Sequence, residues 1–201
     1  MLSVKNSLSD DNLLCFLKRN PSLSSTLFAD CSQDIREVTT IIEPVLKASE
    51  RCQAAAFYIQ AVSLGATGFL ATNLKRQEQV QNGGEGNEDH EEEGIAATET
   101  ASSWLIGRGS TCILNMPDSS VSRCHAVISH HSYAGFFLTD VGSTNGTWVN
   151  GSKLIPRERY TLNDGDLLRF GNLKIELFIS DRRRKTQQPQ NTASCLTTSP
   201  G

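Results

Sequence analysis

The chain has 201 residues, of which 38% are apolar and 20% are charged, and its formal net charge is −3. A length of about 200 residues fits one domain, or one domain with an appended segment, and this composition is that of a chain with an ordinary core and polar stretches. We expect no membrane span, because polar and glycine residues interrupt the longest apolar stretch, near residues 54–69.

Residues 1–78 have the apolar spacing of helices. A first helix is expected to begin at the acidic pair of residues 10 and 11, which can cap it, and to end before Pro21. Farther along, apolar side chains recur at alternating spacings of three and four, which is a heptad pattern. The positions are Ile35, Val38, Ile42, Val45, Cys52, Ala56 and Ile59.

The predicted heptad helix has two imperfections, because Ser49 interrupts the apolar seam and Pro44 removes one backbone donor. Two interpretations remain open. The helix can pack on the first helix within a small bundle, or residues 35–59 can mediate self-association into a homo-oligomer or docking to a partner helix. Nothing in residues 1–78 suggests catalysis.

Residues 79–103 are predicted to be a flexible acidic linker. They carry seven acidic residues and no lysine or arginine, and Ile95 is their only large apolar residue after Val80. Such a segment cannot bury enough apolar surface to offset the entropy lost on ordering. Repulsion between like charges should extend it.

After the linker, the apolar period changes to two, which is typical of strands. Short apolar runs alternate with turn residues such as Asn-Gly and Asp-Gly pairs, so residues 104–180 predict an all-β sandwich of two sheets. The expected strands are 104–106, 112–114, 125–129, 136–138, 147–149, 167–170 and 173–179. Residues 181–201 are interpreted as a flexible tail that is basic and polar.

Polar residues recur at the ends of these strands, in loops that can converge at one end of a sandwich. Two arginines, two hydroxyls and an amide make a set suited to a dianion, because arginine offers a planar, permanently charged fork to phosphate oxygens. The blocks read IGRGS, VSRCHA at 121–126, GSTNGTWVNG at 142–151 and LNDGDLLRFG at 162–171.

With these blocks in this order, residues 104–179 resemble a forkhead-associated (FHA) domain, a module that binds phosphothreonine in a partner protein. The resemblance implies a sandwich of eleven strands whose loops hold the phosphopeptide. In that family, Arg108 would pair with the phosphate, Ser122 and Thr144 would add hydroxyl contacts, and Asn145 would hold the main chain of the ligand. The implied contact residues are Arg108, Ser122, Arg123, Thr144 and Asn145.

The resemblance also implies residues that support the site without touching the ligand. His125 would brace the loops, and the others would shape tight turns. These supporting residues are Gly107, His125, Gly146 and Asn150. Ser120, two residues before Ser122, leaves the sequence preference after the phosphothreonine undetermined.

The resulting hypothesis is a cytoplasmic, phosphothreonine-dependent adaptor that acts downstream of a Ser/Thr kinase. It is not expected to be the kinase, because no nucleotide-binding loop is evident, and no enzyme activity is expected, because no catalytic constellation is visible. No signal-peptide segment is expected. Two alternatives remain open: a phosphate-independent scaffold that acts through the N-terminal helices, and self-regulation in which phosphorylated Thr98 or Thr100 occupies the chain's own or a neighbour's pocket.

No cofactor or metal is predicted. The six cysteines lack the close spacing of a zinc site, and we interpret them as free thiols in a reducing compartment. His130 and His131 have no cysteine or carboxylate partner at ligand spacing. Nucleic acid is not the expected partner, because no predicted domain is strongly basic and the run at 182–185 is short.

Overall fold

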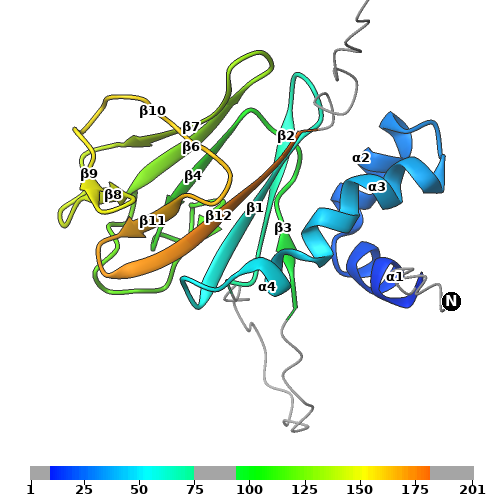
Figure 1. Ribbon diagram of the computed structural model, residues 1–201, viewed down its shortest axis with the longest axis horizontal. Coiled ribbons are helices and arrows are strands. Elements are labelled where there is room, and N and C mark those ends of the chain that lie inside the picture. The colour runs from blue at the N-terminus through cyan, green and yellow to red at the C-terminus, as the bar shows by residue number, and fades with distance from the viewer. Residues whose placement is uncertain (1–9, 75–93, 182–201) are drawn as a thin grey trace, which may run out of the picture.

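The computed structural model describes residues 10–74 and 94–181 of the chain. The described residues form two β-sheets packed face to face, with helices against the outer side of one end of the larger sheet (Figure 1). The larger sheet has seven strands and the smaller sheet has five. The predicted all-β sandwich preceded by a helical segment is therefore confirmed.

The helices are α1 (Asp10–Arg19), α2 (Pro21–Asp30), α3 (Ile35–Leu46) and α4 (Ala48–Arg51). Helix α1 ends just before Pro21, as predicted, and this proline then begins α2, because its fixed φ and missing N–H suit the first turn of a helix. The carboxylate of Asp34 accepts the backbone N–H of Arg36 at 2.9 Å and so caps α3.

Two strands follow the helices, β1 (Phe57–Ser63) and β2 (Gly68–Thr72). The prediction that residues 1–78 are helical throughout is therefore wrong for these two segments. Both strands are buried on both faces, so their sequences are nearly continuous apolar runs without the alternation that marks a half-exposed strand. In this setting, the spacing that continued the heptad pattern to Ile59 is coincidental.

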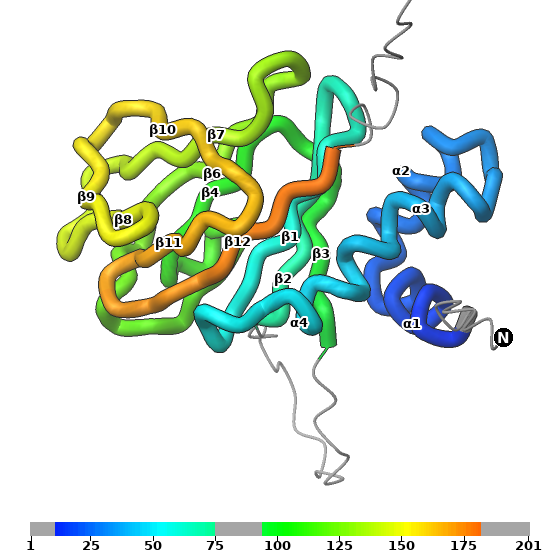
Figure 2. The backbone as a smooth tube through the Cα atoms, viewed as in Figure 1, coloured from blue at the N-terminus to red at the C-terminus, as the bar shows by residue number. Residues whose placement is uncertain are grey.

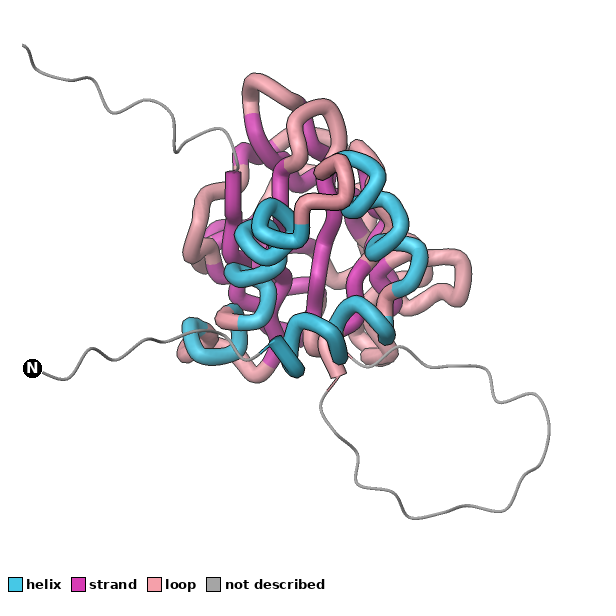
Figure 3. Tube along the Cα trace, turned by 90° about the vertical axis from the view of Figure 1, so that its right-hand side faces the viewer, coloured by secondary structure: helices cyan, strands magenta, loops and turns pink. Residues whose placement is uncertain are grey.

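Helices α1 to α3 cover the outer face of β1 and β2, as the view in Figure 3 shows. From the heptad seam, Val38, Ile42 and Val45 are fully buried, and they belong to one apolar cluster with Phe69 of β2. The opposite faces of these strands, which include Ile59, belong to the sandwich core. Three of the four seam residues on α3 are thus buried within the chain, as in the bundle interpretation, whereas the fourth, Ile35, is exposed. Self-association through residues 35–59 stays a prediction.

Strand β1 pairs in parallel with the last strand, β12 (Leu173–Asp181), from Phe57 opposite Ile175 to Ser63 opposite Asp181 (Figure 2). Residues before the predicted linker therefore complete a sheet whose other strands come from the C-terminal half. The order of the larger sheet is β3-β2-β1-β12-β11-β8-β9. The predicted helical segment and the predicted sandwich therefore both contribute strands to the same sheet.

The acidic linker begins at residue 79, and the portion from 79 to 93 lies outside the described residues. The portion from 94 to 103 is ordered, contrary to the prediction. It contains β3 (Ala96–Ala97), which pairs with β2, and Ala101, which exchanges two backbone hydrogen bonds of 2.9 Å with Gly68. These small residues gain order because the edge of β2 offers hydrogen-bond partners. The predicted tail at 182–201 lies outside the described residues.

The strands from β4 onward follow the seven predicted positions closely, with two short additions, β9 and β10. The smaller sheet has the order β10-β7-β6-β4-β5, and it contains β4 (Ser103–Gly107), β5 (Leu114–Asn115), β6 (Ala126–His131), β7 (Gly135–Asp140) and β10 (Tyr160–Thr161). The larger sheet adds β8 (Thr147–Val149), β9 (Ser152–Lys153) and β11 (Leu167–Phe170). The described residues thus contain twelve strands, of which nine, β4 to β12, belong to the region of the resemblance, against the eleven that it implies.

The core between the two sheets is apolar and closed, with Trp104, Phe136 and Phe170 among its fully buried side chains. Strands β6 and β7 alternate buried and partly exposed residues, so their apolar period of two could be recognised in the sequence. Among the described residues, no helix has the length and apolar character needed to cross a membrane.

Candidate functional site

Three loops form a depression in the surface: one follows β4, one precedes β6, and one joins β7 to β8. Four of the five predicted contact residues line it, and the fifth, Asn145, directly follows a lining residue. The lining residues are Arg108, Gly109, Ser110, Thr111, Ser122, Arg123, Cys124, Gly142 and Thr144.

Two backbone hydrogen bonds hold the loop after β4 against the loop before β6. The N–H of Arg108 donates to the carbonyl of Ser122 at 3.0 Å, and the N–H of Gly109 donates to the carbonyl of Arg123 at 3.1 Å. A Cβ at Gly107 would lie 2.3 Å from the carbonyl oxygen of Arg123, so this approach requires glycine. As a result, the exposed side chain of Arg108 emerges beside Ser122.

The hydroxyls of Ser122 and Thr144 also lie together. Ser122 Oγ accepts the N–H of Thr144 at 3.0 Å, and it is 3.4 Å from Thr144 Oγ1. The neighbouring Asn145 uses its side-chain amide to donate to the carbonyl of Ser120 at 2.8 Å. These hydrogen bonds join the loop before β6 to the loop after β7. The hydroxyls of Ser122 and Thr144 therefore lie side by side and can contact the same ligand group.

Below the loops, His125 is fully buried and joins both of them. Its Nδ1 accepts the N–H of Ser122 at 2.9 Å, so the proton of the neutral ring lies on Nε2, which donates to the carbonyl of Gly146 at 3.0 Å. Burial lowers the pKa of His125, and this effect outweighs the hydrogen bond to Gly146 and the charge of Asp140, which both act to raise it. The neutral ring is therefore the form that supports the loops.

Asp140 is a second buried support, to which the sequence analysis assigned no role. Its carboxylate accepts the N–H groups of Gly142 and Ser143 at 2.7 and 2.8 Å. It also accepts the hydroxyls of Ser143 and Thr147, each at 2.6 Å. Burial alone would raise the pKa of Asp140, but these hydrogen bonds from Ser143, Thr147 and Gly142 lower it overall, so the carboxylate stays charged.

The turn residues Gly146 and Asn150 both have positive φ angles, of 86° and 51°. Asn150 also bonds across to the start of β11, where its side-chain amide reaches Asp166 at 2.8 Å and its oxygen accepts the N–H of Leu167 at 2.9 Å. These two residues therefore hold the β7–β8 loop and β8 in place from outside the pocket.

The charge of the depression is positive. Arg108 and Arg123 are both exposed, and no acidic residue is found among its described lining residues. The carbonyl of Arg123 also accepts the buried thiol of Cys112 at 2.9 Å, and burial raises the pKa of Cys112, which keeps the donor protonated. Two guanidinium groups beside two hydroxyls are a chemically suitable site for a dianion.

Several residues at the site had no assigned role in the sequence analysis. Ser110, Thr111 and Cys124 line the depression, and Asp140 supports it. A signal for Asp140 was available, because aspartate commonly accepts backbone N–H groups two and three residues ahead and Gly142 and Ser143 follow at that spacing. The lining role of Ser110 and Thr111 depends on how the loop after β4 turns, which no local pattern specifies.

Comparisons with known proteins find similarity in the region that contains this site. The family model "FHA domain" matches residues 104–171. The chain is similar to human kanadaptin, with 35% identity over 43% of this chain, and to the FHA domain-containing protein FhaA of Mycobacterium tuberculosis, with 39% identity over 35% of it. It is also similar to the E3 ubiquitin-protein ligase CHFR of Xenopus tropicalis, with 35% identity over 32% of this chain. The matches span only 13%, 13% and 10% of the lengths of these three relatives.

Two solved structures are also similar. One, from a structural and functional analysis of phosphothreonine-dependent FHA domain interactions, is 32% identical, covers 43% of this chain and 84% of its own, and has a TM-score of 0.36. The other is the N-terminal FHA domain of Rad53p from S. cerevisiae in complex with a phosphothreonine peptide. It is 33% identical, covers 33% of this chain and 53% of its own, and has a TM-score of 0.31.

Proposed function

We propose that the depression lined by Arg108, Ser122 and Thr144 binds a phosphothreonine in a partner protein. The observation that carries this proposal is the hydrogen bond of 3.0 Å between Ser122 Oγ and the N–H of Thr144, which joins the two hydroxyl-bearing loops beside the exposed Arg108. The match of residues 104–171 to the FHA domain supports it independently.

Charge favours a phosphate over a neutral ligand. A phosphothreonine carries a charge of about −1.5 to −2 near neutral pH and three acceptor oxygens. Arg108 can donate in a bidentate manner, Ser122 and Thr144 can donate one hydroxyl each, and Arg123 adds a second positive charge at the rim. Bonds of this kind are each stabilising by roughly 1.5–3 kcal/mol, so loss of Arg108 should dominate any loss of affinity.

The site is proposed as a binding site and not as a catalytic one. His125 is the residue that could act as a general base, but it is fully buried and both of its ring nitrogens hold main-chain groups. It therefore has no nitrogen free to take a proton from a ligand. In this proposal the protein acts as an adaptor, which recognises a partner that a Ser/Thr kinase has modified.

Of the two threonines in the self-regulatory alternative, only Thr100 is accessible to a kinase in the folded chain. Thr98 is buried, and its hydroxyl oxygen accepts the N–H of Leu70 at 3.0 Å and donates to the carbonyl of Glu99 at 3.0 Å. A kinase cannot reach this hydroxyl in the folded chain. Thr100 is more exposed, so the alternative concerns Thr100, and loss of phosphate-dependent dimers in Thr100→Ala would support it.

The proposal is tested by calorimetric titration of the full chain with a degenerate phosphothreonine peptide library, beside phosphoserine and unphosphorylated libraries. We expect binding to the phosphothreonine library alone, because selection of threonine over serine can use burial of one methyl group, which contributes roughly 1–3 kcal/mol. Arg108→Ala and Ser122→Ala should each abolish measurable binding.

The matched control is Arg36→Ala, which removes an exposed arginine on α3 and should leave binding unchanged. Equal binding of phosphorylated and unphosphorylated peptides would contradict the proposal. Absence of binding by a chain that unfolds cooperatively would favour the phosphate-independent scaffold, in which the helices on β1 and β2 carry the function.

A further inference from the structure

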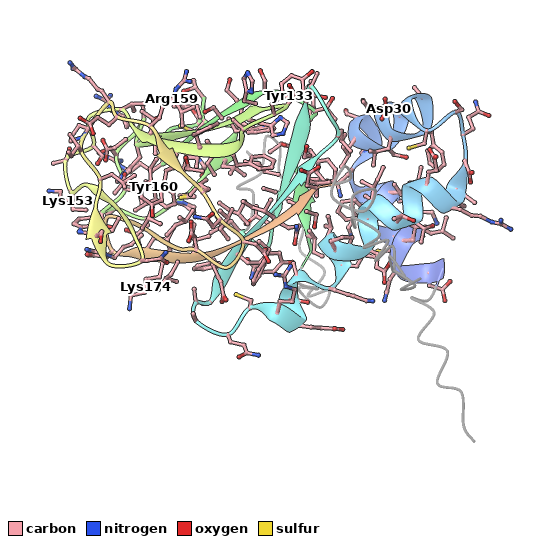
Figure 4. The ribbon with its side chains drawn as sticks, turned by 45° about the horizontal axis from the view of Figure 1, so that its top comes forward. Asp30, Tyr133, Lys153, Arg159, Tyr160 and Lys174 are labelled. Carbon is pink, nitrogen blue, oxygen red and sulfur yellow. The ribbon has the colours of Figure 1, made fainter. Side chains whose placement is uncertain are left out.

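Next to the loop site, the outer face of the larger sheet carries a row of three cations, two of which lie over one indole ring. Strand pairing places Lys153 on β9 opposite Trp148 on β8, Trp148 opposite Arg169 on β11, and Arg169 opposite Lys174 on β12. Directly paired residues share a face of a sheet, so these four side chains form a continuous line. Figure 4 shows Lys153 and Lys174 at the same end of the molecule, with their amino groups directed outwards.

The indole ring of Trp148 orders the middle of this row. The guanidinium carbon of Arg169 lies 3.4 Å from the ring centroid, and Lys153 Nζ lies 5.4 Å from it. Arg169 also donates from Nη1 to the carbonyl of Gly171 at 3.1 Å. Arg169 is therefore held in place, whereas Lys153 and Lys174 are exposed.

The charges of this row are not balanced within the described part of the chain. Arg169 and Lys174 carry like charges directly opposite each other, which destabilises a pair of strands. Glu176 lies two residues along on the same face, but its carboxylate accepts the backbone N–H groups of Gln53 and Ala54 at 2.9 and 2.8 Å. Among the described residues, none of the three cations forms an ion pair with a carboxylate.

The row begins where the loop site ends. Gly146 directly follows the predicted contact residue Asn145, and a Cβ on it would lie 2.6 Å from Lys153 Cε and 3.1 Å from the Trp148 ring. On the other side, Ser120 accepts the amide of Asn145, and its hydroxyl oxygen accepts the N–H of Asn172 at 2.8 Å. Gly146 and Ser120 therefore contact both the loop site and the strands that carry the row, so the two surfaces adjoin.

We propose that Lys153, Arg169 and Lys174 form an anion-binding extension of the loop site, which binds negatively charged side chains beside the phosphothreonine in the same partner segment. This inference rests on the proposed function. Four neighbouring strands span about 14 Å, and an extended peptide advances about 3.4 Å per residue. A stretch of about four residues therefore crosses the row, and its anions can be carboxylates or a second phosphate.

A purely structural role would explain only part of this arrangement. Stacking of Arg169 on Trp148 stabilises the outer face of β8 and β11, and it needs no further cation. Exposed Lys153 and Lys174 add repulsion to the row without forming an ion pair within the described residues. The test therefore removes these two charges and keeps Arg169 and Trp148.

The experiment compares four phosphothreonine peptides on the full chain at low and high salt. One has neutral flanks, two carry three glutamates on one side or the other, and one carries a phosphoserine in place of the favoured glutamates. The quantity measured is the affinity of each charged peptide relative to the neutral one. We expect one glutamate peptide to gain about fivefold to tenfold at low salt, and this gain should shrink as salt screens the charges.

In the double variant Lys153→Gln/Lys174→Gln, the relative gain should fall below about twofold, since two of the three charges are gone. The charge-matched control is Lys18→Gln/Arg36→Gln, which removes two exposed cations from α1 and α3, and it should keep the full gain. A gain with glutamate identifies carboxylates as ligands, and a larger gain with phosphoserine identifies a second phosphate.

The outcomes separate the two proposals. If the neutral phosphothreonine peptide binds but neither flank adds affinity, or if the double variant keeps the gain, the anion-binding extension is wrong and the proposed function stands. If no phosphothreonine peptide binds, the proposed function fails and the extension fails with it.

Discussion

The loop site and the helix-covered end of the larger sheet are built on different principles. The loops are held by polar contacts between specific residues, such as the hydrogen bonds of His125 to Ser122 and Gly146. The strands β1 and β2 are held by burial, with Ile59 and Phe69 both fully enclosed. Specific polar contacts demand particular residue types and so leave a motif, whereas burial accepts many apolar residues of suitable size.

A consequence is that stability and binding should be separable. The helix-covered end supplies apolar burial that lies outside the match at 104–171, and the loops supply side chains that contribute little to the core. Changes at the first region should alter the free energy of unfolding and spare the affinity, and changes at the loops should do the reverse unless they remove a buried support.

The largest effect is expected from a chain reduced to residues 104–181. This change removes β1 and β2, and it exposes the side of β12 that pairs with β1. Loss of Ile59 and Leu70 alone costs roughly 1.5–3 kcal/mol each, against a typical total stability of about 5–15 kcal/mol. Circular dichroism should show no cooperative thermal unfolding for residues 104–181, whereas residues 10–181 should unfold in one cooperative transition. Equal melting temperatures would show that the two regions are independent.

A smaller loss is expected from Ile42→Ala on α3. Ile42 is fully buried between the helices and the sheet, and such a truncation costs about 2–5 kcal/mol. Urea denaturation should show this loss, and the phosphopeptide affinity of the folded chain should stay unchanged. The control Ile35→Ala changes a side chain that is 55% exposed and should alter stability by less than about 0.5 kcal/mol. Reduced affinity in Ile42→Ala would reveal coupling between the regions.

An intermediate effect is expected from Asp140→Asn, which removes a charge and turns one acceptor into a donor. The carboxylate accepts two N–H groups at Oδ1 and two hydroxyls at Oδ2, so in the variant the two hydroxyls lose their acceptor and the charge that strengthens all four hydrogen bonds is gone. We expect a loss of about 1.5–3 kcal/mol in stability together with weaker phosphopeptide binding. The exposed Asp11 on α1 offers a control as Asp11→Asn. Unchanged affinity in Asp140→Asn would mean that the loop does not depend on this support.

The smallest effect concerns pH. Burial lowers the pKa of His125 in the folded chain, so the unfolded chain takes up this proton at the higher pH. The contribution is therefore fully present above the unfolded value of about 6.5 and decreases as pH falls below it. We expect a loss of about 1 kcal/mol between pH 7.5 and 5.5 in ligand-free urea denaturation. The slope in this window should be smaller in His125→Gln, and an identical slope would assign the proton to another group.

The strands of the sandwich region could be predicted from the sequence because they are half exposed and because their turns use Asn-Gly and Asp-Gly pairs. The runs at 147–149 and 167–170 coincide with β8 and β11. The proposed contact residues Arg108, Ser122 and Thr144 were predicted from motifs that lie within a few residues of strand ends. Their convergence in one depression follows from the sandwich, because its loops gather at the ends of the strands.

Residues 57–72 were wrongly predicted to be helical because their strands are not half exposed. A strand buried on both faces loses its alternation, and an apolar run next to helices then continues a helical spacing by chance. The partner of β1 is β12, more than a hundred residues away in the chain, and no local pattern reports such a pairing. Residues 94–103 were misjudged for the same reason, because the edge of β2 orders them.

Local chemistry in the sequence was sufficient to specify the turns, the half-exposed strands and the side chains suited to a dianion, since each of these depends on residues close together in the chain. The tertiary structure alone settled the partner of β1, the covering of β1 and β2 by helices, and the alignment of Lys153, Trp148, Arg169 and Lys174 in one row. These features depend on contacts between distant segments, whose free energy comes from burial and strand pairing that neither segment can achieve by itself.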